Sequence, residues 1–159
     1  MSGGREYPER PVVGVGGVVV RDTAVLLVER AHEPSAGQWS LPGGAVELGE
    51  TLEEAVVGEL REETGLSVQV LELVEAFERI TRDESNRPRY HYVLLDYLCE
   101  PLDGHLRPGS DVRAVAWVRP EEFAAYQLSA KASAVCEKGL ALFRRRGPLR
   151  RSRSSRTCR

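Results

Sequence analysis

The sequence lacks a long apolar run, and no stretch approaches the ~20 residues that a membrane-spanning helix needs. The first ten residues are polar, contain Pro8 and lack the apolar core of an export signal. These absences argue against insertion into a membrane and against export. We therefore expect a cytoplasmic protein with no membrane partner.

Cysteine is also scarce. The three cysteines, Cys99, Cys136 and Cys158, are widely spaced and form no Cys-x-x-Cys pair. Such a set predicts reduced thiols and argues against a zinc site. The lysine-containing motif of P-loop proteins is absent too, so any phosphate chemistry must rely on other groups.

Basic residues are sparse over most of the chain and concentrated at one end. Residues 144–159 contain eight arginines and no acid, which leaves 14 basic and 24 acidic residues in 1–143, a net charge of −10. An acidic body is a poor general binder of polyanions. If this protein acts on phosphates, we expect it to need divalent cations as intermediaries.

The 159 residues suffice for one domain with its own core. Composition predicts a flexible N-terminus at 1–10 and a disordered, arginine- and serine-rich tail at 144–159. Periodicity predicts strands at 11–20, 24–30, 66–80, 90–100 and 111–119, and helices at 52–64, 121–126 and 130–144. This order indicates an α/β fold of the α+β type, with a mixed sheet between helical layers.

The helix at 52–64 has the clearest signature. Thr51 followed by Glu54 forms a capping box, in which each side chain bonds the backbone N–H of the other residue. Gly65 occupies the position of a left-handed C-terminal cap.

Three glycines interrupt the first predicted strand, at Gly14, Gly16 and Gly17. Glycine weakens a strand, so these positions favour a bulge or a close approach of another backbone. Plain packing against a neighbouring element is the alternative.

Glu59, Glu62 and Glu63 lie on one side of the predicted helix at 52–64, because residues i, i+3 and i+4 are neighbours on a helical surface. They border its apolar stripe and are expected to face a surface groove. Repulsion between such neighbours costs about 0.2–0.5 kcal/mol per pair. A hard divalent cation with oxygen ligands would reverse that cost. Taken alone, however, three helical glutamates are more typical of a solvated surface.

The residues around the helix follow a longer pattern. From Gly44, five residues lead to Glu50, and seven more lead to Gly58 and the segment Glu59-Leu60-Arg61-Glu62-Glu63-Thr64-Gly65-Leu66. This resembles the Nudix box, Gly-x5-Glu-x7-Arg-Glu-U-x-Glu-Glu-x-Gly-U with U apolar, at eight of nine specified positions. Chance agreement over 23 residues is remote, and the resemblance extends over residues 11–143.

The resemblance implies a Nudix-like α/β/α sandwich with a mixed β-sheet, in which the helix and the preceding loop form a metal cradle. Glu59, Glu62 and Glu63 would bind Mg²⁺, with Mn²⁺ as a substitute, and Gly43 would add its backbone carbonyl. Glu59 and Glu62 would be the catalytic residues. Glu59 would activate water, either as a base or by positioning it.

The same resemblance gives supporting roles to Gly44, to Glu50, which would hydrogen-bond within the loop, and to Gly65, which would end the helix. The implied reaction is Mg²⁺-dependent hydrolysis of a phosphoanhydride bond in a nucleotide derivative. Metal ions suit this chemistry because they cancel the charge of a diphosphate, orient its oxygens and acidify a bound water. Mg²⁺ prefers oxygen ligands, which carboxylates supply.

One box position departs from the pattern, because Gly58 stands where the family has arginine. That arginine is thought to hold the neighbouring glutamates, and losing a charge-assisted hydrogen bond costs about 1.5–3 kcal/mol. We expect weakened catalysis with metal binding retained. Gly58 is a natural variant whose role is taken over elsewhere, an engineered or accidental change, or a sign that turnover is lost. Arg61 is a poor substitute, because it is expected to point to solvent.

Substrate preference must come from outside the box. Arg79, Arg89 and Tyr92 are candidates for stacking on a base or neutralising a terminal phosphate, unless residues 90–97 simply alternate between core and solvent. Glu100 or Asp111 is a candidate extra metal ligand, although no motif marks either. Residues 90–97 are loosely similar to bacterial ADP-ribose pyrophosphatase-like proteins. ADP-ribose or another nucleotide sugar is therefore the first expected substrate, and a nucleoside triphosphate the second.

Two other classes of function stay open. Gly58 would fit a Nudix fold that binds a nucleotide without cleaving it. The tail at 144–159 could bind RNA phosphates, although a solvated tail is the plainer interpretation and nucleic acid is not the expected partner. The resemblance also makes a homodimer a candidate assembly, but nothing in the sequence identifies an interface.

Overall fold

A hairpin of two strands, β1 (Val12–Arg21) and β2 (Ala24–Arg30), opens the sheet. The structure is a computed structural model and describes residues 5–149. Val20 pairs with Val25, and Asp22 adopts a left-handed conformation with φ of 56°. Aspartate tolerates this conformation in turns. The two predicted strands are therefore joined by a tight turn.

The remaining elements keep the predicted order, with two short strands added before α1. They are β3 (Trp39–Ser40), β4 (Gly43–Ala45), α1 (Leu52–Thr64), β5 (Leu66–Arg82), β6 (Pro88–Gly104), β7 (Val112–Val118), the 3-10 helix η1 (Pro120–Glu122) and α2 (Ala130–Arg146). The very short β3 and β4 fall in a region without any periodicity, which is why the sequence does not predict them. No helix within residues 5–149 is long and apolar enough to cross a membrane.

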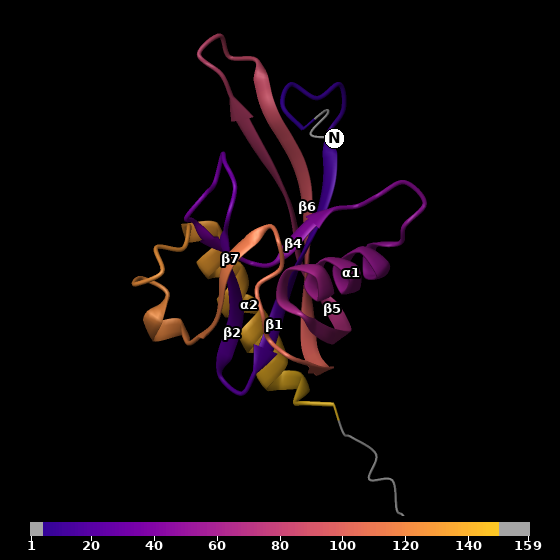
Figure 1. The fold of residues 1–159 in the computed structure, drawn as a ribbon, viewed down its shortest axis with the longest axis vertical. Helices are drawn as coiled ribbons and strands as arrows, with labels where there is room; N and C mark the ends of the chain where they lie inside the picture. Colours follow the sequence, from indigo (N-terminus) through magenta and orange to yellow (C-terminus); the bar gives the residue numbers. More distant parts are fainter. Residues whose placement is uncertain (1–4, 150–159) are drawn as a thin grey trace, which may run out of the picture.

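The described strands form one mixed sheet of seven strands. Its order is β3-β2-β1-β6-β5, with β4 paired to β1 and β7 paired to β2. The β1–β6 pair is parallel, and the others are antiparallel. Helix α1 packs on one face of the sheet and α2 on the other (Figure 1). The predicted α/β/α sandwich is confirmed.

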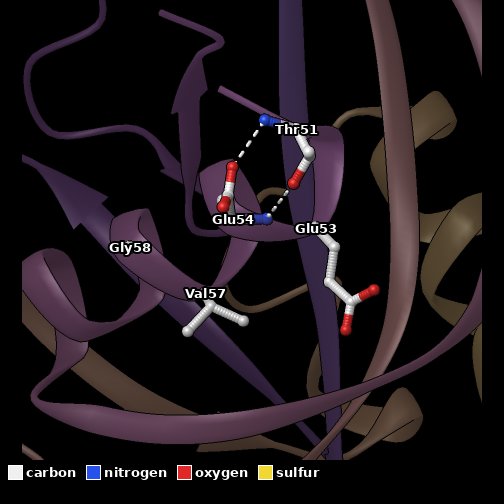
Figure 2. Close-up of a pocket in the computed structure, with 5 residues that line it drawn as sticks. All are labelled: Thr51, Glu53, Glu54, Val57 and Gly58. Atoms are coloured by element: carbon white, nitrogen blue, oxygen red, sulfur yellow. Dashed lines mark hydrogen bonds between the residues drawn. The ribbon is translucent and has the colours of Figure 1, made fainter. Parts of the chain in front are cut away.

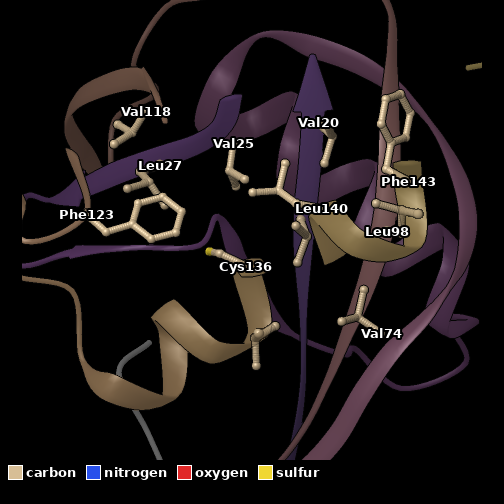
Figure 3. Packing of buried hydrophobic residues seen from close by; sticks show 12 residues of the cluster. Val20, Val25, Leu27, Val74, Leu98, Val118, Phe123, Cys136, Leu140 and Phe143 are labelled. Atoms are coloured by element: carbon tan, nitrogen blue, oxygen red, sulfur yellow. The ribbon is translucent and has the colours of Figure 1, made fainter. Parts of the chain in front are cut away.

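Each face of the sheet has its own apolar core, because successive strand residues point to opposite sides. The core under α1 comprises Val15, Val19, Leu26, Ala55, Val56, Leu60, Leu66, Val68 and Cys99. The core under α2 comprises Val18, Val20, Val25, Leu27, Val74, Leu98, Val118, Phe123, Val135, Cys136, Leu140 and Phe143 (Figure 3). Cys99 and Cys136 are free thiols, as predicted, and Cys158 lies outside the described residues.

Close packing explains the glycines of β1. A Cβ atom on Gly17 would lie 2.7 Å from Cδ1 of Leu60 in α1, and one on Gly14 would lie 2.8 Å from Cδ2 of Leu94 in β6. Both distances are shorter than carbon–carbon contact. The pairings of β1 show no register shift. Of the alternatives that the sequence leaves open, close approach is therefore correct and a bulge is not.

The long hairpin of β5 and β6 extends beyond the body of the molecule (Figure 1). The N-terminal segment attaches to its tip, where the Tyr7 amide donates to the Arg89 carbonyl (2.7 Å) and the Tyr7 hydroxyl donates to Asp83 Oδ2 (3.0 Å). Composition predicts a flexible segment at 1–10, whereas Tyr7 of this segment contacts the hairpin tip. The partners of Tyr7 lie far away in the sequence, so composition carries no sign of them.

Two predictions near the C-terminus are corrected. Residues 121–126 form no α-helix, because after η1 the chain makes only short-range turns and Gln127 has a φ of 53°. So short a segment makes too few helical bonds to offset the cost of nucleation. The tail does not begin at Arg144, because α2 continues through Arg146, which pairs with Glu72 (3.1 Å). Residues 150–159 of the predicted tail lie outside the described residues.

Replacing Leu60 with alanine is expected to lower the free energy of unfolding by about 2–5 kcal/mol, because a cavity would open between α1 and Gly17. Leu48→Ala is the matched control, since Leu48 is fully exposed, and it should change stability by less than about 0.5 kcal/mol. Urea denaturation followed by circular dichroism measures both. Equal losses in the two variants would contradict the proposed contact.

Candidate functional site

Helix α1 begins and ends where its capping residues lie. The Thr51 hydroxyl accepts from the Glu54 amide (3.1 Å), and the Glu54 carboxylate accepts from the Thr51 amide (2.8 Å), as Figure 2 shows. Gly65 ends the helix with a left-handed φ of 75°. These bonds fix the register of α1, and with it the direction in which each glutamate points.

Two consecutive glycines let α1 approach β4. The Gly43 amide donates to Glu63 Oε2 (2.9 Å), and a Cβ on Gly43 would collide with the Val15 carbonyl of β1. A Cβ on Gly44 would collide with the carboxylate of Glu59. A side chain at Gly44 would therefore displace Glu59, and one at Gly43 would disturb the pairing of β4 with β1.

The carboxylates on this side of α1 feel the charges of Arg5 and Arg30 but form a salt bridge with neither. Glu59 and Glu63 are half-buried and Glu62 is exposed. Within residues 5–149, no ion pair joins any of the three to a lysine, arginine or histidine. Burial, and then the charge of Glu62, raises the pKa of Glu59, while the charge of Arg5 offsets part of this effect. Burial also raises the pKa of Glu63 to about 7, against the hydrogen bond from Gly43.

This donor set suits a hard divalent cation, since it consists of carboxylate oxygens whose mutual repulsion a cation would relieve. In the described part of the chain, no three histidine, cysteine, aspartate or glutamate side chains already converge on one point. Mg²⁺ usually keeps several of its waters and needs only one or two protein carboxylates. The residues therefore fit such an ion without enclosing it.

A family model of the NUDIX domain matches residues 10–137. The chain belongs to the Nudix hydrolase family. Members of this family generally need a divalent metal ion, which agrees with the unpaired carboxylates of the Nudix helix α1.

Individual relatives agree with this assignment. The chain is 40% identical over 103 residues to an ADP-ribose pyrophosphatase of Methanocaldococcus jannaschii, which covers 65% of this chain and 59% of that protein. It is 40% identical to a MutT-like protein of Streptomyces ambofaciens, over 77% of this chain and 74% of that protein. The structure of a MutT Nudix hydrolase from Burkholderia pseudomallei superposes with a TM-score of 0.69 at 31% identity, covering 82% and 98% of the two chains. This chain thus spans less than two thirds of the archaeal relative.

The departure from the Nudix box at Gly58 lies beside Glu50. The Glu47 amide donates to Glu50 Oε2 (3.0 Å), which closes the turn before α1. A Cβ built on Gly58 has only Glu50 Oε1 within contact range, at 4.0 Å. Gly58 also lines a shallow hollow together with Thr51, Glu53, Glu54 and Val57 (Figure 2). An arginine here would have free space and would start next to the Glu50 carboxylate.

Arg61 does not occupy this position. Its side chain is exposed, and its Nη2 donates to Ser67 Oγ (3.4 Å) at the start of β5. No described cation replaces the box arginine through an ion pair to Glu50 or Glu59.

Asp111 is an acid near the cradle that no motif marks. Its charge acts on both Glu59 and Glu63, whose pKa values it helps to raise. It lies in the loop before β7, which folding brings towards α1. Its Oδ1 also lies 3.5 Å from His32 Nε2. Glu100, the other candidate extra ligand, accepts a hydrogen bond from the Leu149 amide (3.0 Å) and is not among the charges that shift the pKa of Glu59 or Glu63. Only the three-dimensional structure distinguishes these two acids.

The three predicted substrate residues lie along the β5–β6 hairpin but not at one place. Arg79 pairs with Tyr92 across the two strands, so their side chains share one face. Arg89 lies at the hairpin tip, where its guanidinium binds the Glu6 carboxylate (2.6 Å). Phe77, Glu78, Arg79 and Lys131 line a cleft of about 340 Å³ between the hairpin and α2. The structure thus brings Arg79 and Tyr92 together and leaves Arg89 in a separate contact.

Glu63→Gln is expected to stabilise the metal-free protein at high pH. The pKa of Glu63 is raised from 4.5 to about 7, so the folded state holds a proton that the unfolded chain releases between these values. The wild type therefore loses stability as pH rises from 4.5 to 7, and the glutamine variant is spared this loss of at most about 3 kcal/mol. Thermal melts in a chelator should show a gain at about pH 8 that vanishes near pH 4. An equal gain at both pH values would contradict this origin.

Proposed function

We propose that this protein hydrolyses a phosphoanhydride bond in a nucleoside diphosphate linked to a second group, with Mg²⁺ held by Glu59, Glu62 and Glu63. The observation that carries the proposal is the set of unpaired carboxylates that Gly43 and Gly44 allow to lie against β4. The Gly43 carbonyl would complete the ligand set, and Mn²⁺ would substitute for Mg²⁺.

Different residues of this chain have different roles in such a reaction. When bound, Mg²⁺ would neutralise the diphosphate and acidify a water molecule. Glu59 is held in place against Gly44, and burial raises the pKa of its carboxylate, which makes it a stronger base towards water. Glu62 is exposed on the same side of α1 and is the second proposed catalytic residue. Glu50 and Gly65 support the site through the turn before α1 and the cap after it.

ADP-ribose or another nucleotide sugar is the favoured substrate. A relative of 40% identity is named ADP-ribose pyrophosphatase, and the hairpin cleft offers an aromatic ring and cations beside the sheet. Hydrolysis of a nucleoside triphosphate to a monophosphate and pyrophosphate is the second candidate reaction. A cytoplasmic location and a homodimer stay part of this proposal, as the sequence leads us to expect.

A nucleotide-binding protein without turnover is the one alternative that a specific observation favours. Gly58 leaves the Glu50 carboxylate without the guanidinium that the box normally supplies. Loss of one charge-assisted bond costs about 1.5–3 kcal/mol, which slows a dependent step by roughly ten- to hundredfold and does not abolish it. Weakened hydrolysis is therefore the better supported of the two functions.

Glu59→Gln is expected to abolish most hydrolysis of the preferred substrate. A panel of ADP-ribose, other nucleotide sugars, dinucleoside polyphosphates and nucleoside triphosphates, with Mg²⁺ and then Mn²⁺, would be followed by chromatography of the products. We expect a loss of at least about a hundredfold in kcat, because glutamine cannot take a proton from water. Glu53→Gln is the matched control, as Glu53 is an exposed acid of the same helix. Full activity of Glu59→Gln, or no turnover of any substrate by the wild type, would refute the proposal.

Gly58→Arg is expected to raise kcat about ten- to hundredfold, because its guanidinium would meet the Glu50 carboxylate that lies 4.0 Å from the built Cβ. Gly58→Ala is the control, since it removes the cost of a helical glycine, about 1 kcal/mol, without adding a charge. Steady-state kinetics of the two variants separate these effects. A rate for Gly58→Arg at or below that of Gly58→Ala would overturn the role given to the missing arginine.

A further inference from the structure

Asp96, in the middle of β6, is a buried acid that the proposed hydrolytic chemistry does not use. It is 7% exposed and pairs with Gly16 of β1 on one side and with Glu75 of β5 on the other. A Cβ on Gly16 would collide with the Asp96 carboxylate. The missing side chain at Gly16 therefore makes the room that this carboxylate fills.

The carboxylate of Asp96 has no partner. Within residues 5–149, no hydrogen bond or ion pair involves it. Lys131, whose charge acts on it, binds Glu75 instead (2.9 Å) and stands 4.4 Å from the centre of the Phe77 ring. Burial raises the pKa of Asp96 to about 6, and the charge of Arg79 offsets only part of this effect. A buried acid without a partner is costly, and a ligand that donates a hydrogen bond would remove the cost.

The carboxylate of Asp96 lies on the side of the sheet that α2 covers. Asp96 shares a face of β6 with Leu98, which packs in the core under α2. The cleft that Arg79 and Lys131 line lies on this face, and the charges of both residues act on Asp96. No fully buried side-chain oxygen in the described residues lacks a partner. The unpaired oxygens of Asp96 therefore touch accessible space.

A short stretch of backbone separates Asp96 from the metal cradle. The Pro42 carbonyl accepts from the Gly17 amide (3.0 Å) and lies 3.5 Å from a Cβ built on Gly16, beside Asp96. The next residue is Gly43, whose amide binds Glu63. Asp96, on the α2 side, and the cradle carboxylates, on the α1 side, are therefore close neighbours across the sheet, and the proposed nucleotide reaches from one to the other past Pro42.

We propose that Asp96 determines substrate specificity by accepting a hydrogen bond from the exocyclic amino group of a nucleobase such as adenine or cytosine. This inference rests on the proposed function, because it takes the substrate to be a nucleotide derivative. Phosphate groups would be repelled by the carboxylate. A sugar hydroxyl both donates and accepts, whereas an amino group only donates and so matches a group that only accepts.

The wild type is expected to prefer ADP-ribose over its hypoxanthine analogue, which carries a carbonyl oxygen in place of the amino group. The ratio of the two kcat/KM values should be about 10- to 100-fold, the size typical of a hydrogen bond to a charged group. Asp96→Asn should bring this ratio close to one, because an amide both donates and accepts. Asp103→Asn is the matched control, since Asp103 is an exposed acid of the same strand and should leave the ratio unchanged.

Calorimetric binding of AMP and IMP to the full chain without metal keeps this inference distinct from hydrolysis. Preference for AMP in the wild type, lost in Asp96→Asn, supports the role of Asp96 even if no substrate is turned over, in which case only the hydrolase proposal fails. Equal binding of AMP and IMP, binding of neither, or a preference retained in Asp96→Asn overturns the inference, while hydrolysis can still stand. If thermal melts show that Asp96→Asn does not fold, the wild-type comparison alone decides.

Discussion

Leu60 of α1 rests directly on Gly17 of β1, and the geometry of the site follows from that contact. A side chain at Gly17 would lift the helix from the sheet, and the glutamates one turn along would move with it. Gly43 and Gly44 repeat the arrangement at β4, where they receive Glu63 and Glu59. Gly17, Gly43 and Gly44 thus determine how deeply the carboxylates are buried. The degree of burial in turn determines how far the carboxylates are desolvated.

Desolvation then determines what the site can bind. Exposed glutamates on a helix repel each other weakly and need no partner. Glu59 and Glu63 are half-buried, and burial is the first cause of the raised pKa of each. In a body with a net charge of −10, no described basic side chain pairs with them. A divalent cation is the simplest species that relieves this arrangement, and it would also attract a diphosphate.

Local signals predicted the fold and the ends of α1 well, because their information is local. The capping box at Thr51 and the cap at Gly65 fix α1 from within a few residues, and the structure confirms both ends of the helix. Contacts between distant segments had no such signal. Nothing near Tyr7 points to Asp83, nothing near Asp111 points to α1, and Arg79 meets Tyr92 only through the hairpin register. The helix wrongly predicted at 121–126 has another cause. Over one or two turns, the apolar spacing of a helix also fits a series of tight turns, and here such turns bury Phe123.

The cradle and the hairpin cleft use the same physical device on neighbouring strands. At Gly44 and at Gly16, a missing Cβ admits a carboxylate that has no internal partner, Glu59 in one case and Asp96 in the other. Each acid is costly until something from outside compensates it, and the compensating species differ in kind. Glu59 lies among other acids and calls for a cation, whereas Asp96 lies within reach of the charges of Arg79, Glu75 and Lys131 but bonds none of them, and calls for a hydrogen-bond donor. One strand pair, β1 and β4, thereby carries both a site suited to metal-assisted chemistry and a site suited to discrimination between bases. The two sites lie on opposite faces of the sheet, and the backbone at residues 42–43 lies between them.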